Sequence, residues 1–115
     1  MHSRWMFVSA LALSACATTQ FGSGRLERAE ASIKAAEEIG ANAVPDARLY
    51  VQLAKDQTTT AKRLASDGDD RAPMMLARAQ ADADLALVMA RESAARAEAV
   101  RAGAELETVQ QRGTP

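Results

Sequence analysis

Residues 73–112, PMMLARAQADADLALVMARESAARAEAVRAGAELETVQQR, decide the fold of this chain. After Pro73 no proline interrupts the sequence until Pro115. Proline is tolerated in the first turn of a helix, because the amide hydrogen that it lacks would have no partner there. We therefore expect one long helix, about 60 Å in length at a rise of 1.5 Å per residue. Its apolar positions follow the three-four spacing of a buried helix face: Leu76, Ala79, Ala83, Ala86, Ala90 and Ala97.

Gly103 interrupts the expected helix. Glycine inside a helix costs about 1 kcal/mol relative to alanine, because it loses more backbone freedom on folding. We expect the residues beyond Gly103 to fray.

The composition also favours helices. Alanine occupies 27 of the 115 positions, whereas aromatic residues account for only 3 %. Few β-branched and aromatic residues disfavour sheets, and a chain of this length forms a single domain. The net charge of −1 offers no basic surface for nucleic acid, so no nucleic-acid partner is expected. The expected fold is all-α, either an antiparallel helical hairpin or a three-helix coiled bundle with one long C-terminal helix.

Two shorter helices are expected before the long one, from Arg25 to about Ala43 and from about Pro45 onward. Residues 58–60, three consecutive threonines, weaken the second helix locally, but we expect them to remain helical. Because each of these helices is about half as long as the third, the third must overhang, bend or meet another chain. The expected buried positions are Leu26, Ala29, Ile33, Ala36 and Gly40 in the first helix, and Tyr50, Leu53, Gln57, Thr60 or Ala61, and Leu64 in the second.

The sequence SDGDD at residues 66–70 predicts the turn between the second and third helices. Gly68 suits the left-handed position after a helix, and Asp69 or Asp70 suits the N-cap of the next one. Three carboxylates so close together also invite a calcium interpretation. The spacing lacks the acidic ladder and the glutamate of an EF-hand loop, so we expect a capped, solvated turn and no metal.

The first fifteen residues have the pattern of a secretory signal. Arg4 gives a positive start, and residues 5–13 form an apolar run that is too short to span a bilayer, which takes about 20 residues. The run ends at Cys16, the only cysteine, so no intramolecular disulfide can form. The last residues of this segment resemble the lipobox of bacterial lipoproteins: Leu13, Ser14, Ala15 and Cys16.

The lipobox resemblance implies that the Cys16 thiol receives a diacylglyceryl group and that the signal is cut just before it. Two or three acyl chains would hold the protein on a membrane, whereas a single chain binds reversibly. Ala17, where aspartate would favour the inner membrane, implies an outer-membrane location facing the periplasm. The expected organisation is a signal at 1–15, a lipidated cysteine and flexible tether at 16–24, and an alanine-rich helical domain at 25–112. The alternative is an ordinary signal peptide, or a short anchor helix with a buried cysteine.

A glycine-aspartate turn at Gly68 and Asp69 precedes a helix that carries an Arg-Ala, Asp-Ala, Leu-Ala series at 78–79, 82–83 and 85–86. In this respect the chain resembles domain-of-unknown-function family 4398, over roughly residues 28–95. Members of that family are bacterial envelope proteins, often lipoproteins, with a short alanine-rich helical unit. The resemblance implies an envelope location and a helical shape, and it transfers no catalytic residue.

Residues 16–115 contain no histidine, and their single thiol is the one expected to carry lipid. The usual general base, nucleophile pair and zinc ligands are therefore missing, and no glycine-rich loop could bind phosphate. Paired carboxylates could perform acid-base chemistry only in a cleft that shifts their pKa. We expect solvated faces or caps there instead, with no catalytic residue, cofactor, metal or small-molecule substrate. The pairs are Glu37 and Glu38, Asp69 and Asp70, and Asp82 and Asp84.

Charges of alternating sign lie near the middle of the long helix, and they include an i,i+4 pair that stabilises a solvated helix. A solvated face is the simplest interpretation, and a docking stripe for a partner helix or an acidic glycan is the alternative. Apolar clusters at 74–76 and 85–89 wrap more than one side of this helix, which favours self-association or an envelope protein partner. The charged positions of the possible partner face are Arg91, Glu92, Arg96, Glu98 and Arg101.

These observations together predict a lipid-anchored structural or protein-interaction module of the cell envelope. One alternative is an accessory subunit of an envelope transport or secretion complex. Another is a non-covalent peptidoglycan binder.

Overall fold

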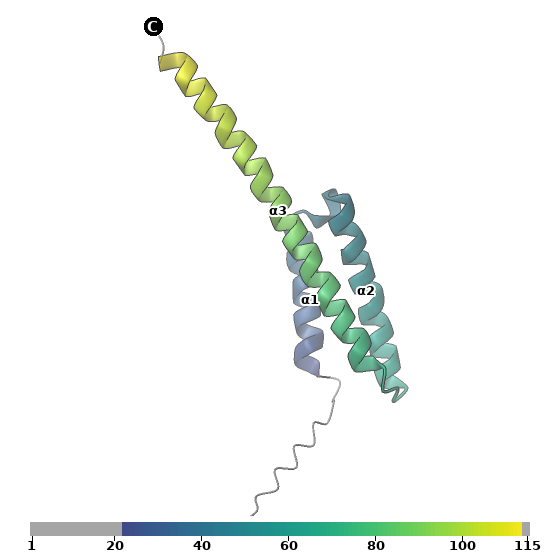
Figure 1. Ribbon diagram of the computed structural model, residues 1–115. Helices are drawn as coiled ribbons and strands as arrows, with labels where there is room; N and C mark the ends of the chain where they lie inside the picture. Colours follow the sequence, from purple (N-terminus) through teal and green to yellow (C-terminus); the bar gives the residue numbers. More distant parts are fainter. Residues whose placement is uncertain (1–21, 114–115) are drawn as a thin grey trace, which may run out of the picture.

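The computed structural model describes residues 22–113, so the predicted signal at 1–15, the lipobox and Cys16 lie outside the described residues. Three helices, α1 (Ser23–Glu38), α2 (Pro45–Ser66) and α3 (Ala72–Gly113), make up most of this part (Figure 1). A short 3-10 helix, η1 (Ala41–Ala43), lies between α1 and α2. The all-α fold with one long C-terminal helix is confirmed, and it is a three-helix arrangement rather than a hairpin.

Helix α3 lies against both shorter helices. Figure 1 shows α1 and α3 running in the same direction, with α2 antiparallel to them. The most extensive contact joins α2 and α3, the next joins α1 and α3, and α1 touches α2 least. Ala90 is the last buried residue of α3. Glu92, Ser93 and Arg96 still line a shallow hollow with Val44 and Asp46 at the start of α2, and every residue of α3 beyond Ser93 is exposed. The segment after Ala90, residues 91–113, is called the overhang below and is about 34 Å long at 1.5 Å per residue. Of the outcomes expected for the third helix, which were to overhang, to bend or to meet another chain, the structure shows the overhang.

Helix α1 ends five residues before the predicted Ala43, because Gly40 stops it. The backbone of Gly40 is left-handed, with a φ of 96°, and its amide donates to the carbonyl of Glu37 at 3.1 Å. The Ile39 amide donates to the Ala35 carbonyl at 3.2 Å, so the last carbonyl groups of α1 are satisfied locally. Gly40 is therefore a helix stop and not a position in the buried seam. The start of α2 at Pro45 agrees with the prediction.

Small side chains form the buried face of α3. The predicted positions from Leu76 to Ala90 are all 1 % exposed or less, and Leu76 is the largest of the fully buried side chains in the described part. Ala97 was also expected to be buried and is exposed, because α1 and α2 end before they reach it. Alanine lets helix backbones approach closely, but it buries little apolar area per residue.

The predicted seam of α2 is wrong over its first half. Leu53 is 38 % exposed, and Tyr50 and Gln57 are only half-buried. Leu64 is buried as predicted, and of the two alternatives Thr60 and Ala61 it is Ala61 that is buried. The prediction favoured large side chains, but an alanine-rich interface selects small ones that fit a narrow gap. Thr58 fits because its hydroxyl donates to the Ala54 carbonyl at 2.7 Å. The buried residues of α2 are Ala47, Val51, Ala54, Thr58, Ala61 and Leu64.

The expectation that the chain frays after Gly103 is also wrong in this structure, since α3 is helical to Gly113. Residues 104–112 are mostly strong helix formers, which outweigh one glycine. The Thr108 hydroxyl additionally donates to the Ala104 carbonyl at 2.9 Å. The three threonines of α2 remain helical as predicted. Within residues 22–113, no helix combines the length and the low charge that crossing a membrane requires.

Candidate interaction surface

The turn between α2 and α3 is built by Gly68 and Asp69. Gly68 has a φ of 69°, which confirms the predicted left-handed position. The Asp69 Oδ1 atom accepts from the Arg71 backbone amide at 2.9 Å, and Asp69 Oδ2 lies 2.7 Å from Arg71 Nη2. The side-chain and backbone hydrogen bonds from Arg71 lower the pKa of Asp69 to about 2, and the same carboxylate raises the pKa of Arg71. Asp69 therefore caps α3, while Asp70 is exposed beside it.

Polar side chains bridge each pair of helices. Two ion pairs, Lys55 with Glu37 and Lys62 with Glu30, join α2 to α1. The Ser32 hydroxyl of α1 donates to Asp84 of α3 at 2.7 Å, and Gln57 Nε2 of α2 donates to Asp82 of α3 at 2.8 Å. Glu37, Asp82 and Asp84 thus take part in contacts between helices, whereas Glu38 forms an ion pair with Lys34 within α1. A shift of one helix along another would break the contacts between helices, so they help to fix the axial alignment of the bundle.

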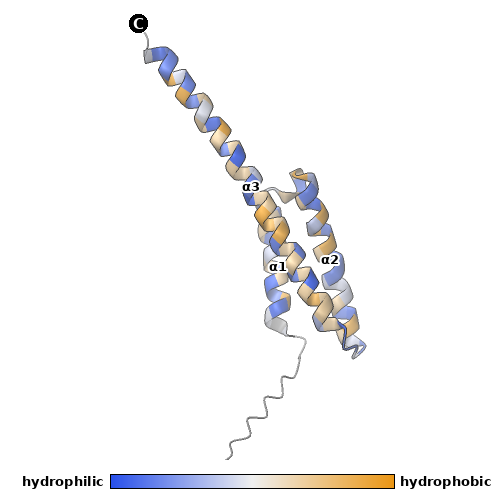
Figure 2. Ribbon diagram, in the orientation of Figure 1, coloured by the Kyte–Doolittle hydropathy of each residue, from blue (hydrophilic) through white to orange (hydrophobic). Residues whose placement is uncertain are grey.

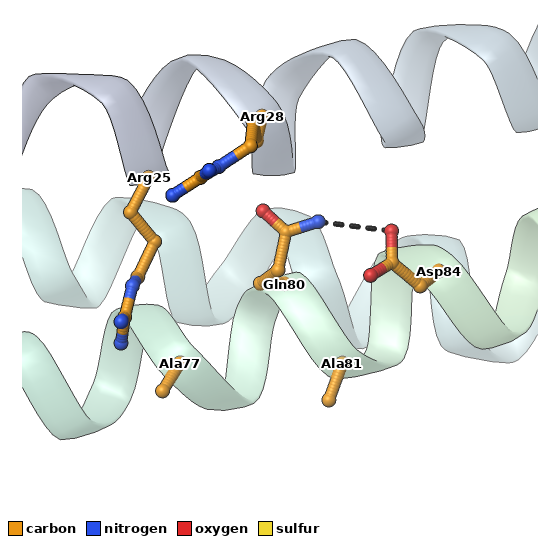
Figure 3. Close-up of a pocket in the computed structure, with 6 residues that line it drawn as sticks. All are labelled: Arg25, Arg28, Ala77, Gln80, Ala81 and Asp84. Atoms are coloured by element: carbon orange, nitrogen blue, oxygen red, sulfur yellow. Dashed lines mark hydrogen bonds between the residues drawn. The ribbon is translucent and has the colours of Figure 1, made fainter.

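An open groove between α1 and α3 is shown in Figure 3. Arg25 and Arg28 of α1 line one side of it, and Gln80 and Asp84 of α3 line the other. The Gln80 Nε2 atom donates to Asp84 at 2.9 Å, whereas the buried Gln80 Oε1 atom accepts no hydrogen bond within the described part. In Figure 3 the Arg28 guanidinium extends from α1 over the groove on the side of Arg25. These residues form a polar edge of the α1–α3 contact.

No set of three or more His, Cys, Asp or Glu side chains within residues 22–113 is arranged to hold a metal ion. In the turn at 66–70, Asp69 caps α3 through the Arg71 amide, Asp67 Oδ2 lies 3.6 Å from Arg63 Nη1, and Asp70 is exposed.

The five charged residues of the predicted partner face all lie on the overhang, where each is exposed. At 100° per residue they do not form one stripe. Glu92 and Arg96 share one side and form an ion pair, Arg91 and Glu98 share a second side, and Arg101 lies on a third. The structure therefore brings together only the i,i+4 pair.

A second apolar face of α3 lies opposite the buried one. The sequence analysis expected apolar residues on more than one side of this helix at 74–76 and 85–89, but it did not trace them as one continuous face. We call this face the outer seam. Its large members include Val88, which is 57 % exposed, and Leu106 and Val109, which are 63 % and 65 % exposed. In the sequence this face corresponds to a second three-four repeat, whose residues alternate with those of the core repeat and are therefore hard to recognise. All eleven positions of the outer seam are exposed: Met74, Arg78, Ala81, Leu85, Val88, Glu92, Ala95, Ala99, Ala102, Leu106 and Val109.

Apolar residues on opposite faces explain a contrast between α2 and α3. Helix α2 has a clear amphipathic asymmetry, whereas α3 has almost none. Figure 2 shows apolar and polar residues interspersed along the whole of α3, including the overhang. The candidate functional surface of the described protein is therefore the outer seam, together with the overhang.

Comparisons with protein-family models, with curated proteins and with solved structures find no match for this chain. The resemblance to domain-of-unknown-function family 4398 stays a prediction.

Proposed function

We propose that this chain is a bacterial envelope lipoprotein, anchored through Cys16 in the outer membrane, whose helical body serves as a structural or protein-interaction module. One observation carries the proposal. A lipobox-like sequence at residues 13–16 closes an apolar run, and the first helix of a water-facing bundle begins at Ser23, a few residues later. A lipid on Cys16 would hold the bundle close to a membrane through a short tether.

The surface of α3 supports an interaction role. Every residue of the overhang beyond Ser93 is exposed, and the outer seam continues along it with Leu106 and Val109, which are 63 % and 65 % exposed. An apolar stripe that long on a helix without neighbours is typical of a contact surface.

Metabolic labelling with a palmitate analogue tests the anchor. We expect label on the wild-type chain, none on Cys16→Ser, and full label on the control Val100→Glu, whose substitution lies on the overhang. Mass spectrometry of the wild-type protein should find an amino terminus at an acylated Cys16. An unmodified thiol, or equal labelling of Cys16→Ser, would contradict the proposal.

The overhang favours a second candidate, an accessory subunit of an envelope transport or secretion complex. A helix that projects about 34 Å from its bundle can reach another component of an assembly. Affinity purification from detergent extracts tests this, with a chain shortened after Ser93 as the control. A single stoichiometric partner that is lost with the overhang would support the accessory role, and unchanged recovery of every bound protein would reject it.

A further inference from the structure

The outer seam has the repeat of a coiled coil. From Met74 to Val109 its positions are spaced by four and three residues without a break, over five heptads. Nine of its eleven positions are apolar, and Arg78 and Glu92 are the two exceptions. Apolar a and d positions that persist beyond three or four heptads are typical of helices that pair. The bundle leaves this repeat uncovered, because α1 and α2 pack on the opposite face.

The two charges in the seam discriminate between possible arrangements of two such helices. In a parallel pair without offset, each seam residue faces its own copy, so Arg78 would meet Arg78 and Glu92 would meet Glu92. The flanking positions would then bring Arg91 of each chain next to Arg96 of the other. Like charges at these positions disfavour the parallel pair.

An antiparallel pair that is centred between Leu85 and Val88 removes each of these contacts between like charges. Leu85 then faces the partner's Val88 in the two central layers. Arg78 and Glu92 each face an alanine, and they lie in adjacent layers on opposite chains, so the opposite charges are about one helical turn apart.

The flanking positions of the same antiparallel pair are complementary as well. Asp84 of each chain falls beside the partner's Arg91. Because the pair has a two-fold axis, every attractive contact occurs twice. Both the seam charges and the flanking charges therefore favour this one arrangement.

We infer that the outer seam of α3, from Met74 to Ala99, binds a second copy of this chain in an antiparallel coiled coil centred on Leu85 and Val88. The last seam positions, Ala102, Leu106 and Val109, lie beyond the paired part because the partner's α3 begins at Ala72. The inference deepens the proposed interaction role of α3 and is independent of the lipid anchor. In the resulting dimer each bundle lies beside the other, and the two overhangs project in opposite directions.

Two exposed valines of α3 give a matched pair of variants. Val88 lies at the centre of the outer seam, whereas Val100 is 72 % exposed and lies away from it. Sedimentation of the full chain in detergent should show a dimer for the wild type and for Val100→Glu. Val88→Glu places two carboxylates in the central layers and should raise the dissociation constant of the dimer about 100-fold. A monomeric wild type, or equal dimerisation of the two variants, would overturn the inference.

Cysteine cross-linking tests the direction of the two helices. When Leu85→Cys and Val88→Cys chains are co-expressed, oxidation should join them, because their β-carbons lie in the same layer. Ala99→Cys should not link to itself, since its partner in the antiparallel pair is Met74. Self-linking of Ala99→Cys without linking of the 85–88 pair would overturn the antiparallel arrangement. The wild-type chain, which retains Cys16, supplies the background, and circular dichroism checks that each variant is folded.

Loss of the palmitate label and loss of the dimer are separate readouts. A chain that dimerises without carrying lipid would contradict the proposed anchor alone. A labelled chain that stays monomeric would contradict the inference alone.

Discussion

Val88 and Ala90 lie two residues apart on α3 and face opposite directions: Ala90 is 1 % exposed and Val88 is 57 % exposed. Ala90 ends the face that packs against α1 and α2, and Val88 belongs to the outer seam. One helix thus carries two apolar faces, of which the bundle uses only one.

Enlarging a buried alanine of α3 should destabilise the bundle. Ala86→Leu adds three carbon atoms at a position that is fully buried against the other helices, and overpacking of this kind costs about 1–3 kcal/mol. Ala97→Leu is the control, because Ala97 is exposed on the overhang and its substitution should change the free energy of unfolding by less than about 0.5 kcal/mol. Urea unfolding followed by circular dichroism measures both. Equal losses would mean that Ala97 is buried in solution.

The same glycine-to-alanine substitution should have opposite effects at two positions. Gly68 has a φ of 69°, and a side chain in that conformation costs about 1–2 kcal/mol, so Gly68→Ala should lower the melting temperature. Gly103 is helical with open space around it, so Gly103→Ala should strengthen the overhang and slow its amide hydrogen exchange. Faster exchange in Gly103→Ala would contradict the helical conformation of Gly103. A Gly68→Ala chain as stable as the wild type would contradict the left-handed conformation of Gly68.

The cap of α3 should weaken in acid. Hydrogen bonds from Arg71 lower the pKa of Asp69 from 3.8 to about 2. Because the pKa is lower in the folded chain, the Asp69 contribution to stability is complete above pH 3.8 and is lost as the pH falls through about 2. The NMR shift of the Asp69 carboxyl carbon measures the titration directly.

Arg71→Ala should raise the pKa of Asp69, but not fully to 3.8, since the backbone amide of residue 71 still donates. The control Arg78→Ala should leave the midpoint unchanged. A midpoint near 3.8 in the wild-type chain would contradict the capping geometry.

The ion pair between Lys55 and Glu37 should contribute little to stability. The Lys55 side chain is 44 % exposed and that of Glu37 is 32 % exposed, and pairs in such settings are worth about 0.2–1 kcal/mol. A double-mutant cycle with Lys55→Ala and Glu37→Ala should give a coupling energy in this range that falls as salt is added. A coupling energy above about 2 kcal/mol would show that the pair is buried more deeply than the structure indicates.

Much of the fold could be predicted because its signals are local. Pro45, Pro73 and Gly68 mark helix starts and a turn through fixed backbone preferences, and all three act as expected. The buried seam of α3 was read correctly from Leu76 to Ala90, because its three-four spacing is regular.

The errors share a different cause, which is that burial depends on neighbouring helices. Nothing in the local sequence says that α1 and α2 stop before Ala97, or that a narrow interface buries Thr58 while it leaves Leu53 38 % exposed. The sequence analysis expected exposed apolar residues only at 74–76 and 85–89, and the continuation of the outer seam to Val109 was missed because its repeat overlaps the core repeat. The predicted lipid site at Cys16 lies outside the described residues and stays a prediction.

Pulsed electron paramagnetic resonance on spin labels at position 97 tests the two-faced role of α3 most directly. A full chain that carries Ala97→Cys in a Cys16→Ser background, purified in detergent, places one label on each overhang of a dimer. The antiparallel pair predicts a separation of about 30–40 Å, because residue 97 then lies about 21 residues along the helix axis from its counterpart. A separation below about 30 Å, as two labels at the same height on the outer sides of neighbouring parallel helices would give, or the absence of any interaction between labels, would contradict the account.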